Sequence, residues 1–257
     1  MNMNTWKNNN VLTRFKESYF LREDMSREMT SGLPSDARLV GGTIFYIDDA
    51  ADGEYEFFDA NGNVIEDVSV GDRPYAYRAI KRGSEDKYYV YHDRVYNGRW
   101  AYFISDKRSE SRPLGVRVNE SLGTSTGIGS GKTNTEKVMN KDGGAYVTKD
   151  VEGYPTIWYQ LQQVRDSKAG GCDDWFVPSR DEMEELKEAI KSRVITGGEI
   201  AGSSYKDSAL NSKWLWSSSE LSERPARYAE LWNCIMQHWL PSGKYDGGTS
   251  VLFIRAF

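Results

Sequence analysis

The sequence predicts an α+β fold, in which strands and helices occupy separate stretches of the chain. Residues 37–105 carry short runs rich in β-branched and aromatic residues, separated by turn signals. Two amphipathic helices follow between residues 157 and 190, and the chain ends on the apolar run Val251–Phe257. Strands followed by helices favour α+β over the alternating order of an α/β fold.

The strand signals between residues 37 and 105 are short and are bounded by glycine, aspartate or asparagine, which are typical of turns. Asn61-Gly62 lies between two apolar runs and predicts a hairpin, because both residues tolerate positive φ. The predicted strands are Gly42–Ile47, Tyr55–Phe58 and Val64–Ile65 as the hairpin, Tyr75–Ile80, Lys87–His92 and Arg99–Ile104.

Two helices are predicted after a stretch rich in glycine, serine and threonine. That stretch, residues 106–150, is interpreted as long surface loops with one short helical turn near Thr135–Met139. The first helix stops at Gly170-Gly171, and the second opens with a capping box between Ser179 and Glu182. The apolar stripes are Ile157, Trp158, Leu161 and Val164 in the first helix and Met183, Leu186 and Ile190 in the second.

Composition excludes several classes of protein. The 257 residues hold 33 Lys and Arg against 38 Asp and Glu, which gives a net charge of −5. A pI near 5.3 argues against a nucleic-acid binder with a broad basic face. No stretch approaches the roughly 20 apolar residues that span a bilayer, and the first residues lack the apolar core of a signal peptide. We therefore expect no nucleic-acid partner, no membrane insertion, and a protein that is cytoplasmic or carried in a virus particle.

Residues 1–36 differ from the rest of the chain and are predicted to form an N-terminal helical arm. Leu12, Phe15 and Tyr19 share one helical face. The arm would pack on the domain or on a neighbouring subunit, where it could support a homo-oligomer, although a loosely ordered tail fits the same residues equally well. The rest of the chain, residues 37–257, is the predicted globular domain.

No motif of established catalytic or ion-binding chemistry is complete. Gly127–Thr133 resembles a phosphate-binding loop, but Thr126 stands where the first glycine is required and no buried strand precedes it. Residues 59–63 imitate a calcium loop with its glycine in the wrong place. His92 and His238 are the only histidines, and their spacing supports neither a catalytic triad nor a zinc site. The sequence therefore predicts no metal and no cofactor.

Residues 223–250 do not follow the pattern of any regular element. Large apolar, aromatic and polar residues are mixed with no sustained period of 2 or 3.6. Trp232 and Met236 are the best candidates for the core. The other apolar residues are predicted on exposed turns, where an apolar patch usually marks a partner. Tyr and Trp among small polar residues are also typical of adaptable binding loops.

Five segments carry a resemblance to a known family. Within these segments, only Leu215 and residues 252–254 differ from the motifs of that family, which are given in parentheses below. The segments are Gly41–Ile47 (an opening strand), Gly127–Thr135 (G-I-G-x-G-x-x-N-T), Gly171–Glu182 (G-x-x-D-W-x-x-P-[ST]-x-x-E), Trp214–Glu220 (Y-W-S-S-[ST]-E) and Val251–Phe257 (V-R-P-V-R-A-F). Together they resemble a family with the C-type lectin fold that includes the Lcl C-terminal and Fibrobacter major paralogous domains.

The resemblance implies a C-type lectin fold, similar to that of formylglycine-generating enzymes, with two helices, antiparallel strands and long loops. The terminal strands of this fold pair, so Gly42–Ile47 is expected beside Val251–Phe257. A subset of the family ends in the motifs W-S-S-S-E and R-A-F and is diversified by retroelements. In these proteins, reverse transcription errs at template adenines and so rewrites a C-terminal variable region. In this chain that region would be about residues 221–250.

The function that the resemblance implies is that of a variable protein of a diversity-generating retroelement. Such a protein is not expected to be an enzyme. It binds a receptor or another ligand, which is a protein or a glycan, and it mediates adhesion on phage or bacterial surfaces. Its fixed backbone lets loop side chains change at little cost to stability. The expected ligand-binding residues are Tyr228, Asn233, Ile235, His238, Trp239, Leu240, Tyr245 and Asp246.

Two alternatives remain open. The same broad fold hosts formylglycine-generating oxidases, which use a cysteine pair and copper, and this chain has two cysteines, Cys172 and Cys234. Neither cysteine lies in a segment that resembles that active site. The other alternative is a structural subunit of a fibre or capsid that assembles through the N-terminal arm.

Overall fold

The computed structural model describes seven stretches of the chain and shows a mixed α+β architecture. No helix in these stretches is long and apolar enough to cross a bilayer. The predicted helical arm lies outside them, apart from its last five residues. The described residues are 32–101, 121–147, 155–192, 214–220, 228–233, 238–243 and 249–257.

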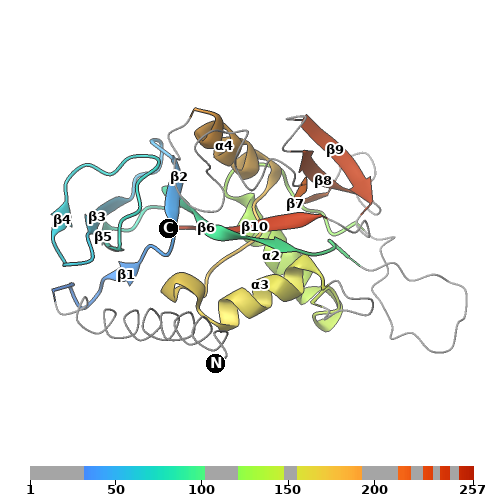
Figure 1. Cartoon of the computed structure of the whole chain (residues 1–257), viewed down its shortest axis with the longest axis horizontal. Coiled ribbons are helices and arrows are strands. Elements are labelled where there is room, and N and C mark those ends of the chain that lie inside the picture. Colours follow the sequence, from blue (N-terminus) through green and yellow to red (C-terminus); the bar gives the residue numbers. More distant parts are fainter. Residues whose placement is uncertain are drawn as a thin grey trace, which may run out of the picture.

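The larger sheet has six strands in the order β2-β6-β10-β7-β8-β9 (Figure 1). Neighbouring strands are antiparallel, except that β10 and β7 pair in parallel at Ser250 and Leu215. The strands are β2 (Thr43–Ile47), β6 (Tyr88–Asn97), β7 (Trp214–Glu220), β8 (Tyr228–Asn233), β9 (His238–Gly243) and β10 (Ser250–Ala256).

Helices cover both faces of this sheet (Figure 1). Leu252 of β10 packs in a cluster with α4 (Arg180–Lys191). Its neighbour Phe253 belongs to the cluster on the other side, which includes α3 (Ile157–Asp166). Because both faces of β10 are buried, its sequence is a continuous apolar run and does not alternate with polar residues.

The smaller sheet has the order β1-β5-β3-β4 and includes the predicted hairpin. In the hairpin loop the Asp59 carboxylate accepts the backbone N–H groups of Asn61 and Asn63 at 2.8 and 2.9 Å, and Gly62 has a φ of 85°. This confirms a turn rather than a calcium loop. The strands are β1 (Arg38–Leu39), β3 (Glu54–Phe58), β4 (Val64–Ile65) and β5 (Ala76–Lys81).

The two predicted helices are confirmed with their buried stripes, and the predicted cap of the second is confirmed; the first, however, ends at Asp166, before the predicted stop at Gly170-Gly171, which lies in a 3₁₀ turn (Ala169–Gly171). Thr156 caps α3 by accepting the Tyr159 N–H, and the buried residues of α3 are the four that the sequence predicts. Ser179 and Glu182 form the predicted capping box at the start of α4. Local signals suffice here because each cap and each stripe lies within a few residues of the chain.

The interpretation of residues 106–150 as loops with one helical turn is wrong. Helix α2 (Ser130–Asn140) has 11 residues, and the 3₁₀ turn Lys141–Gly143 follows it. The buried face of α2 includes Gly131 and the polar residues Asn134 and Thr135 before Val138 and Met139, so its first two turns show no apolar stripe. Both polar residues make hydrogen bonds to other segments, including Asn134 to Ser218 at 3.1 Å, and these bonds satisfy the polar groups on burial.

The predicted strand Arg99–Ile104 is also wrong where the structure describes it, which is up to residue 101. The preceding strand, β6, extends to Asn97 and contains a register shift. Beyond it, Arg99 makes only an isolated parallel bridge with Thr156 at the start of α3. Trp100 is fully buried, so its large apolar side chain reflects the core and not a strand.

The expected pairing of the first and last strands of the domain is wrong, because β6 lies between β2 and β10. Tyr91 of β6 pairs with Thr43 on one side and with Ile254 on the other. β6 is ten residues long and buried in its first half, where it needs hydrogen-bonding partners on both edges. The two strands therefore belong to the same sheet but are one strand apart.

Candidate ligand-binding surface

The region expected to be variable starts and ends on two neighbouring buried strands. β7 ends at Glu220 and β10 begins at Ser250, and these two strands pair in parallel. Every residue of β10 is buried, and in β7 only Trp214 is partly exposed. Residues 221–249 therefore leave a rigid frame and return to it at the next strand.

The serine run of β7 supplies buried hydrogen bonds rather than a catalytic nucleophile. Ser217, Ser218 and Ser219 are fully buried. The Ser219 hydroxyl donates to the Ser125 carbonyl at 2.8 Å and accepts the Arg180 N–H at 3.1 Å. The serines thus join β7 to α4 and to the segment before α2, which satisfies polar groups that burial would otherwise leave unpaired.

Glu220 anchors a second segment at the end of β7. Its carboxylate accepts the backbone N–H groups of Leu122 and Thr124, at 2.9 and 3.5 Å, and the Ser121 hydroxyl at 3.4 Å. Its own backbone N–H donates to the Thr124 hydroxyl at 2.7 Å. Because a charged acceptor strengthens such bonds, Glu220 fixes the point where the chain leaves the frame.

Thr249 fixes the point where the chain returns. Its hydroxyl accepts the indole N–H of Trp216 at 2.6 Å and donates to the Gly98 carbonyl at 3.0 Å. The indole of Trp100 donates to the Ser217 carbonyl at 3.0 Å. These contacts hold β7, the start of β10 and the end of β6 together.

Between these anchors lies a hairpin at the edge of the larger sheet. β8 pairs with β7 on one side and with β9 on the other, and β9 is the last strand in the sheet order. The sequence pattern indicated turns and aperiodic structure for residues 223–250, and the strands β8 and β9 correct that interpretation. The mixed composition shows no alternation of polar and apolar residues, so it gave no strand signal. These strands form nevertheless, because their pairing depends on the neighbouring strand β7 and not on alternation alone.

The register of this hairpin divides the expected binding residues between two faces. Directly opposite residues share a face, and successive residues alternate. Asn233 pairs with His238, and Leu240 lies two residues further on the same face. Trp239 pairs with Trp232 on the other face, where Tyr228 also lies. The candidates Ile235, Tyr245 and Asp246 lie outside the described residues, as does Met236, which was assigned to the core.

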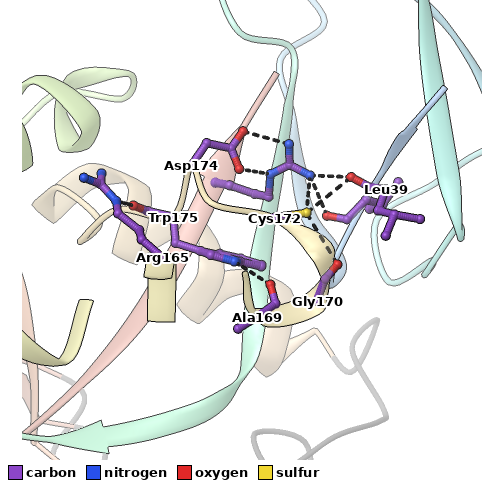
Figure 2. Close-up of polar contacts among 9 residues, drawn as sticks. Leu39, Arg165, Ala169, Gly170, Cys172, Asp174 and Trp175 are labelled. Carbon is purple, nitrogen blue, oxygen red and sulfur yellow. Dashed lines mark hydrogen bonds and ion pairs between the residues drawn. The ribbon is translucent and has the colours of Figure 1, made fainter. Parts of the chain in front are cut away.

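Arg255 anchors the end of β10 to the smaller sheet; its partners Leu39, Cys172 and Asp174 are labelled in Figure 2. Its side chain is 3% exposed, and its guanidinium forms a two-pronged ion pair with Asp174 at 2.8 Å for each contact. It also donates to the carbonyls of Leu39 and Val40 at 2.6 and 3.0 Å. One side chain thus connects β10, the loop before α4 and β1.

Cys172 lies against this guanidinium and is buried. Its thiol is 3.1 Å from an Arg255 nitrogen and 3.4 Å from the Leu39 carbonyl. Burial raises the pKa of the Cys172 thiol to about 11, and the nearby Arg255 only partly offsets this increase. A neutral, enclosed thiol is a poor nucleophile, because the thiolate is the reactive form.

This environment predicts that Cys172 does not react with a thiol reagent in the folded protein. In a Cys234→Ser variant, labelling by dithionitrobenzoate at pH 8 should be at least about a hundredfold slower than that of a free thiol. In denaturing urea the labelling should become fast. Fast labelling of the native variant would contradict the structural role and would favour the oxidase alternative.

Glu182 occupies the position that a phosphate would take in a phosphate-binding loop. Its carboxylate accepts the N–H groups of Gly129 and Gly131, at 2.9 and 3.3 Å, and of Ser179 at 2.6 Å. Gly129, at the start of α2, has a φ of 81°. Burial raises the pKa of Glu182 to about 7, although these N–H donors act to lower it. The loop therefore serves a side chain of the protein itself, consistent with rejecting nucleotide binding there.

The segments of this frame are visible in the sequence, but the roles of several of its residues are not. Glu220, Thr249 and Arg255 act through partners about 30 to 220 positions away in the chain, so no local pattern could assign them. The signal that was available was chemical: a Glu and an Arg inside otherwise buried strands need partners. In the described ranges, no three His, Cys, Asp or Glu side chains gather as a metal site would require.

Comparisons with protein-family models, with curated proteins and with solved structures found no match for this chain.

Proposed function

We propose that the protein is a non-enzymatic binding module with a C-type lectin fold, whose ligand-binding surface is built on residues 221–250. The observation that carries the proposal is the double anchoring of this segment. Glu220 and Thr249 hold its two ends through hydrogen bonds to other parts of the frame. The hairpin between them lies at the edge of the sheet, so a partner can approach from that side.

This arrangement suits a surface that changes in sequence. Among the residues whose burial is described, the core clusters of the frame are made by β2, β3, β5, β6, β7, β10, the three helices and the segments between them. Side chains on an edge hairpin carry less of the core than those of a central strand, so they tolerate substitution at smaller cost. The proposal therefore includes diversification of residues 221–250 by a retroelement and a role in adhesion to a phage or bacterial surface.

The diversification part of the proposal has a direct genetic test. Sequencing the DNA beside the gene should reveal a near-repeat of its 3′ end that differs at adenines and lies next to a reverse transcriptase. A flanking region with neither feature would contradict diversification. The protein would then bind its ligand through a surface of fixed sequence.

The binding part predicts that Trp239 and Tyr245 contribute contact area, because aromatic side chains provide large surfaces at low entropic cost. Fluorescently labelled protein should stain some strains in a panel of bacterial cells, measured by flow cytometry. Trp239→Ala/Tyr245→Ala should abolish staining and leave the melting temperature nearly unchanged.

The matched control is Tyr159→Ala, since Tyr159 lies on α3 and outside residues 221–250, and it should stain like the wild type. If the double variant lost several kcal/mol of stability, as large core truncations do, the two aromatic residues would belong to the core. If it stained normally, the ligand-binding surface would lie elsewhere.

A further inference from the structure

An apolar recess of about 370 Å³ lies at the smaller sheet. Among the described residues, its wall is formed by β1 and the two glycines after it, by the loop and second strand of the β3–β4 hairpin, by residues 73–75 and by Gly170. The strands of the smaller sheet lie at the end of the molecule away from β8 and β9 (Figure 1). The recess is therefore separate from the proposed ligand-binding surface.

The two charged side chains in the described part of the wall are already paired. The Asp59 carboxylate accepts N–H groups of its own hairpin loop, and Arg73 forms an ion pair with Asp93. The backbone N–H of Tyr75 is also bonded, to the Phe58 carbonyl at 2.9 Å. The described wall thus presents aliphatic and aromatic surface without a free charge, and such a surface suits apolar side chains.

The N-terminal segment of the chain enters the domain beside this recess. The described residues begin at Gly32, which packs against the hairpin loop next to Ala60, a residue of the recess wall. A Cβ atom on Gly32 would lie 2.8 Å from the Asn61 carbonyl oxygen, and one on Gly62 would lie 2.7 Å from the Gly32 carbonyl carbon. Glycine at both positions permits this close approach, so the fold fixes the end of residues 1–31 at the edge of the recess.

The composition of the N-terminal segment complements this end of the domain. Residues 39–72, which supply most of the described recess wall, hold nine Asp and Glu and no Lys or Arg. Residues 1–22 hold four Lys and Arg and one Glu. Their apolar residues Leu12, Phe15 and Tyr19 share one face of the predicted helix. Opposite charges favour the encounter of the two segments and fix its register, while the apolar face matches the recess.

We propose that the apolar face of residues 12–19 docks in this recess of its own domain. Twelve residues lie between Tyr19 and Gly32, and an extended chain spans about 3.3 Å per residue, so the connecting segment is long enough to turn back to the recess. The sequence left two places for the arm, its own domain or a neighbouring subunit. An arm docked on its own domain is not free to join subunits, which argues against the fibre or capsid alternative.

Thiol labelling of the full chain tests this docking. Ala60→Cys is introduced into the Cys234→Ser variant, and the reaction with dithionitrobenzoate is followed at about 1 and about 50 µM protein. The docked arm should cover the new thiol, so labelling should be slow at both concentrations. Asn140→Cys in the same background places a thiol on an exposed residue at the end of α2 and should be labelled fast.

Two pairs of substitutions in the arm separate its apolar face from its charge. Phe15→Asp/Tyr19→Asp should release the arm and speed up labelling of the Ala60→Cys thiol by about tenfold, because the docked state would no longer be the main population. Thr13→Asp/Ser18→Asp adds the same charge outside the apolar face, so labelling should stay slow.

Two results would overturn the proposal. Equal labelling rates with the original arm and both altered arms would show that the apolar face does not cover the recess. Protection that disappears on dilution would show that the arm of a second copy covers it. Circular dichroism would confirm that each variant is folded, and Ile65→Cys would replace Ala60→Cys if that variant were not. Because Trp239→Ala/Tyr245→Ala should retain the protection, failure of this proposal and failure of the proposed function can be distinguished.

Discussion

Replacing Arg255 with methionine is expected to lower the free energy of unfolding by about 3–5 kcal/mol, one of the largest effects of a single substitution in this chain. Methionine matches the length of the aliphatic stem but supplies no donor. The carbonyls of Leu39 and Val40 would lose a charged hydrogen-bond partner. Each unsatisfied buried group costs about 1–3 kcal/mol.

The Asp174 side chain is 38% exposed, so water can partly solvate it in the variant. Most of the expected loss therefore comes from the carbonyls and from the packing of the guanidinium over the rings of Tyr77 and Phe257. Arg255→Lys keeps the charge but cannot reproduce the planar fork, so its loss should be intermediate.

Urea denaturation of the wild type and the two variants measures this effect. Arg94→Met is the matched control, because that arginine is exposed, and its effect should stay within about 0.5 kcal/mol. A loss below about 1 kcal/mol for Arg255→Met would show that the Arg255 side chain does not hold β10 to β1 and to the loop before α4.

Replacing Glu182 with glutamine is expected to destabilise the protein by about 2–3 kcal/mol at pH 8. The carboxylate accepts backbone N–H groups with both oxygens. Glutamine has one oxygen, so its amide nitrogen must face an N–H group of Ser179 or of the Gly129 loop. At least one donor then stays unsatisfied at the start of α2 or α4.

The same pair of proteins should differ in the pH dependence of stability. Burial raises the pKa of Glu182 from 4.5 to about 7 in the folded protein, so between these values the folded state binds the proton more tightly than the unfolded chain. The stability linked to this proton is fully present below pH 4.5 and is lost as the pH rises through 7. Glutamine does not titrate.

The stability difference between the wild type and Glu182→Gln should therefore increase in favour of the wild type by about 2 kcal/mol as the pH falls from 8 to 5. Taking the difference removes the effect of other carboxylates. Denaturation curves at three pH values in this interval would measure it. A difference that stays constant or shrinks on acidification would mean that the backbone donors, and not burial, control the pKa of Glu182.

The elements that sequence analysis placed correctly are those whose signals are local. The capping box of α4, the apolar stripes of α3 and α4 and the Asn61-Gly62 hairpin each depend on residues within about one or two turns of one another. Helix α2 was underestimated because Asn134 and Thr135 make up part of its buried face. A polar residue can be buried when a distant partner satisfies it, and that partner is not visible in the local sequence.

The sequence by itself determined the α+β class, the two amphipathic helices, the strand-rich first half and the apolar last strand. Only the tertiary structure decided that β6 separates β2 from β10, that β8 and β9 extend the sheet beyond β7, and that Glu182, Glu220 and Arg255 join segments far apart in the chain. The physical reason is range. Helix periodicity and caps act over a few residues, whereas strand order and the partners of buried charges are fixed by contacts between distant segments, which form only when the core closes.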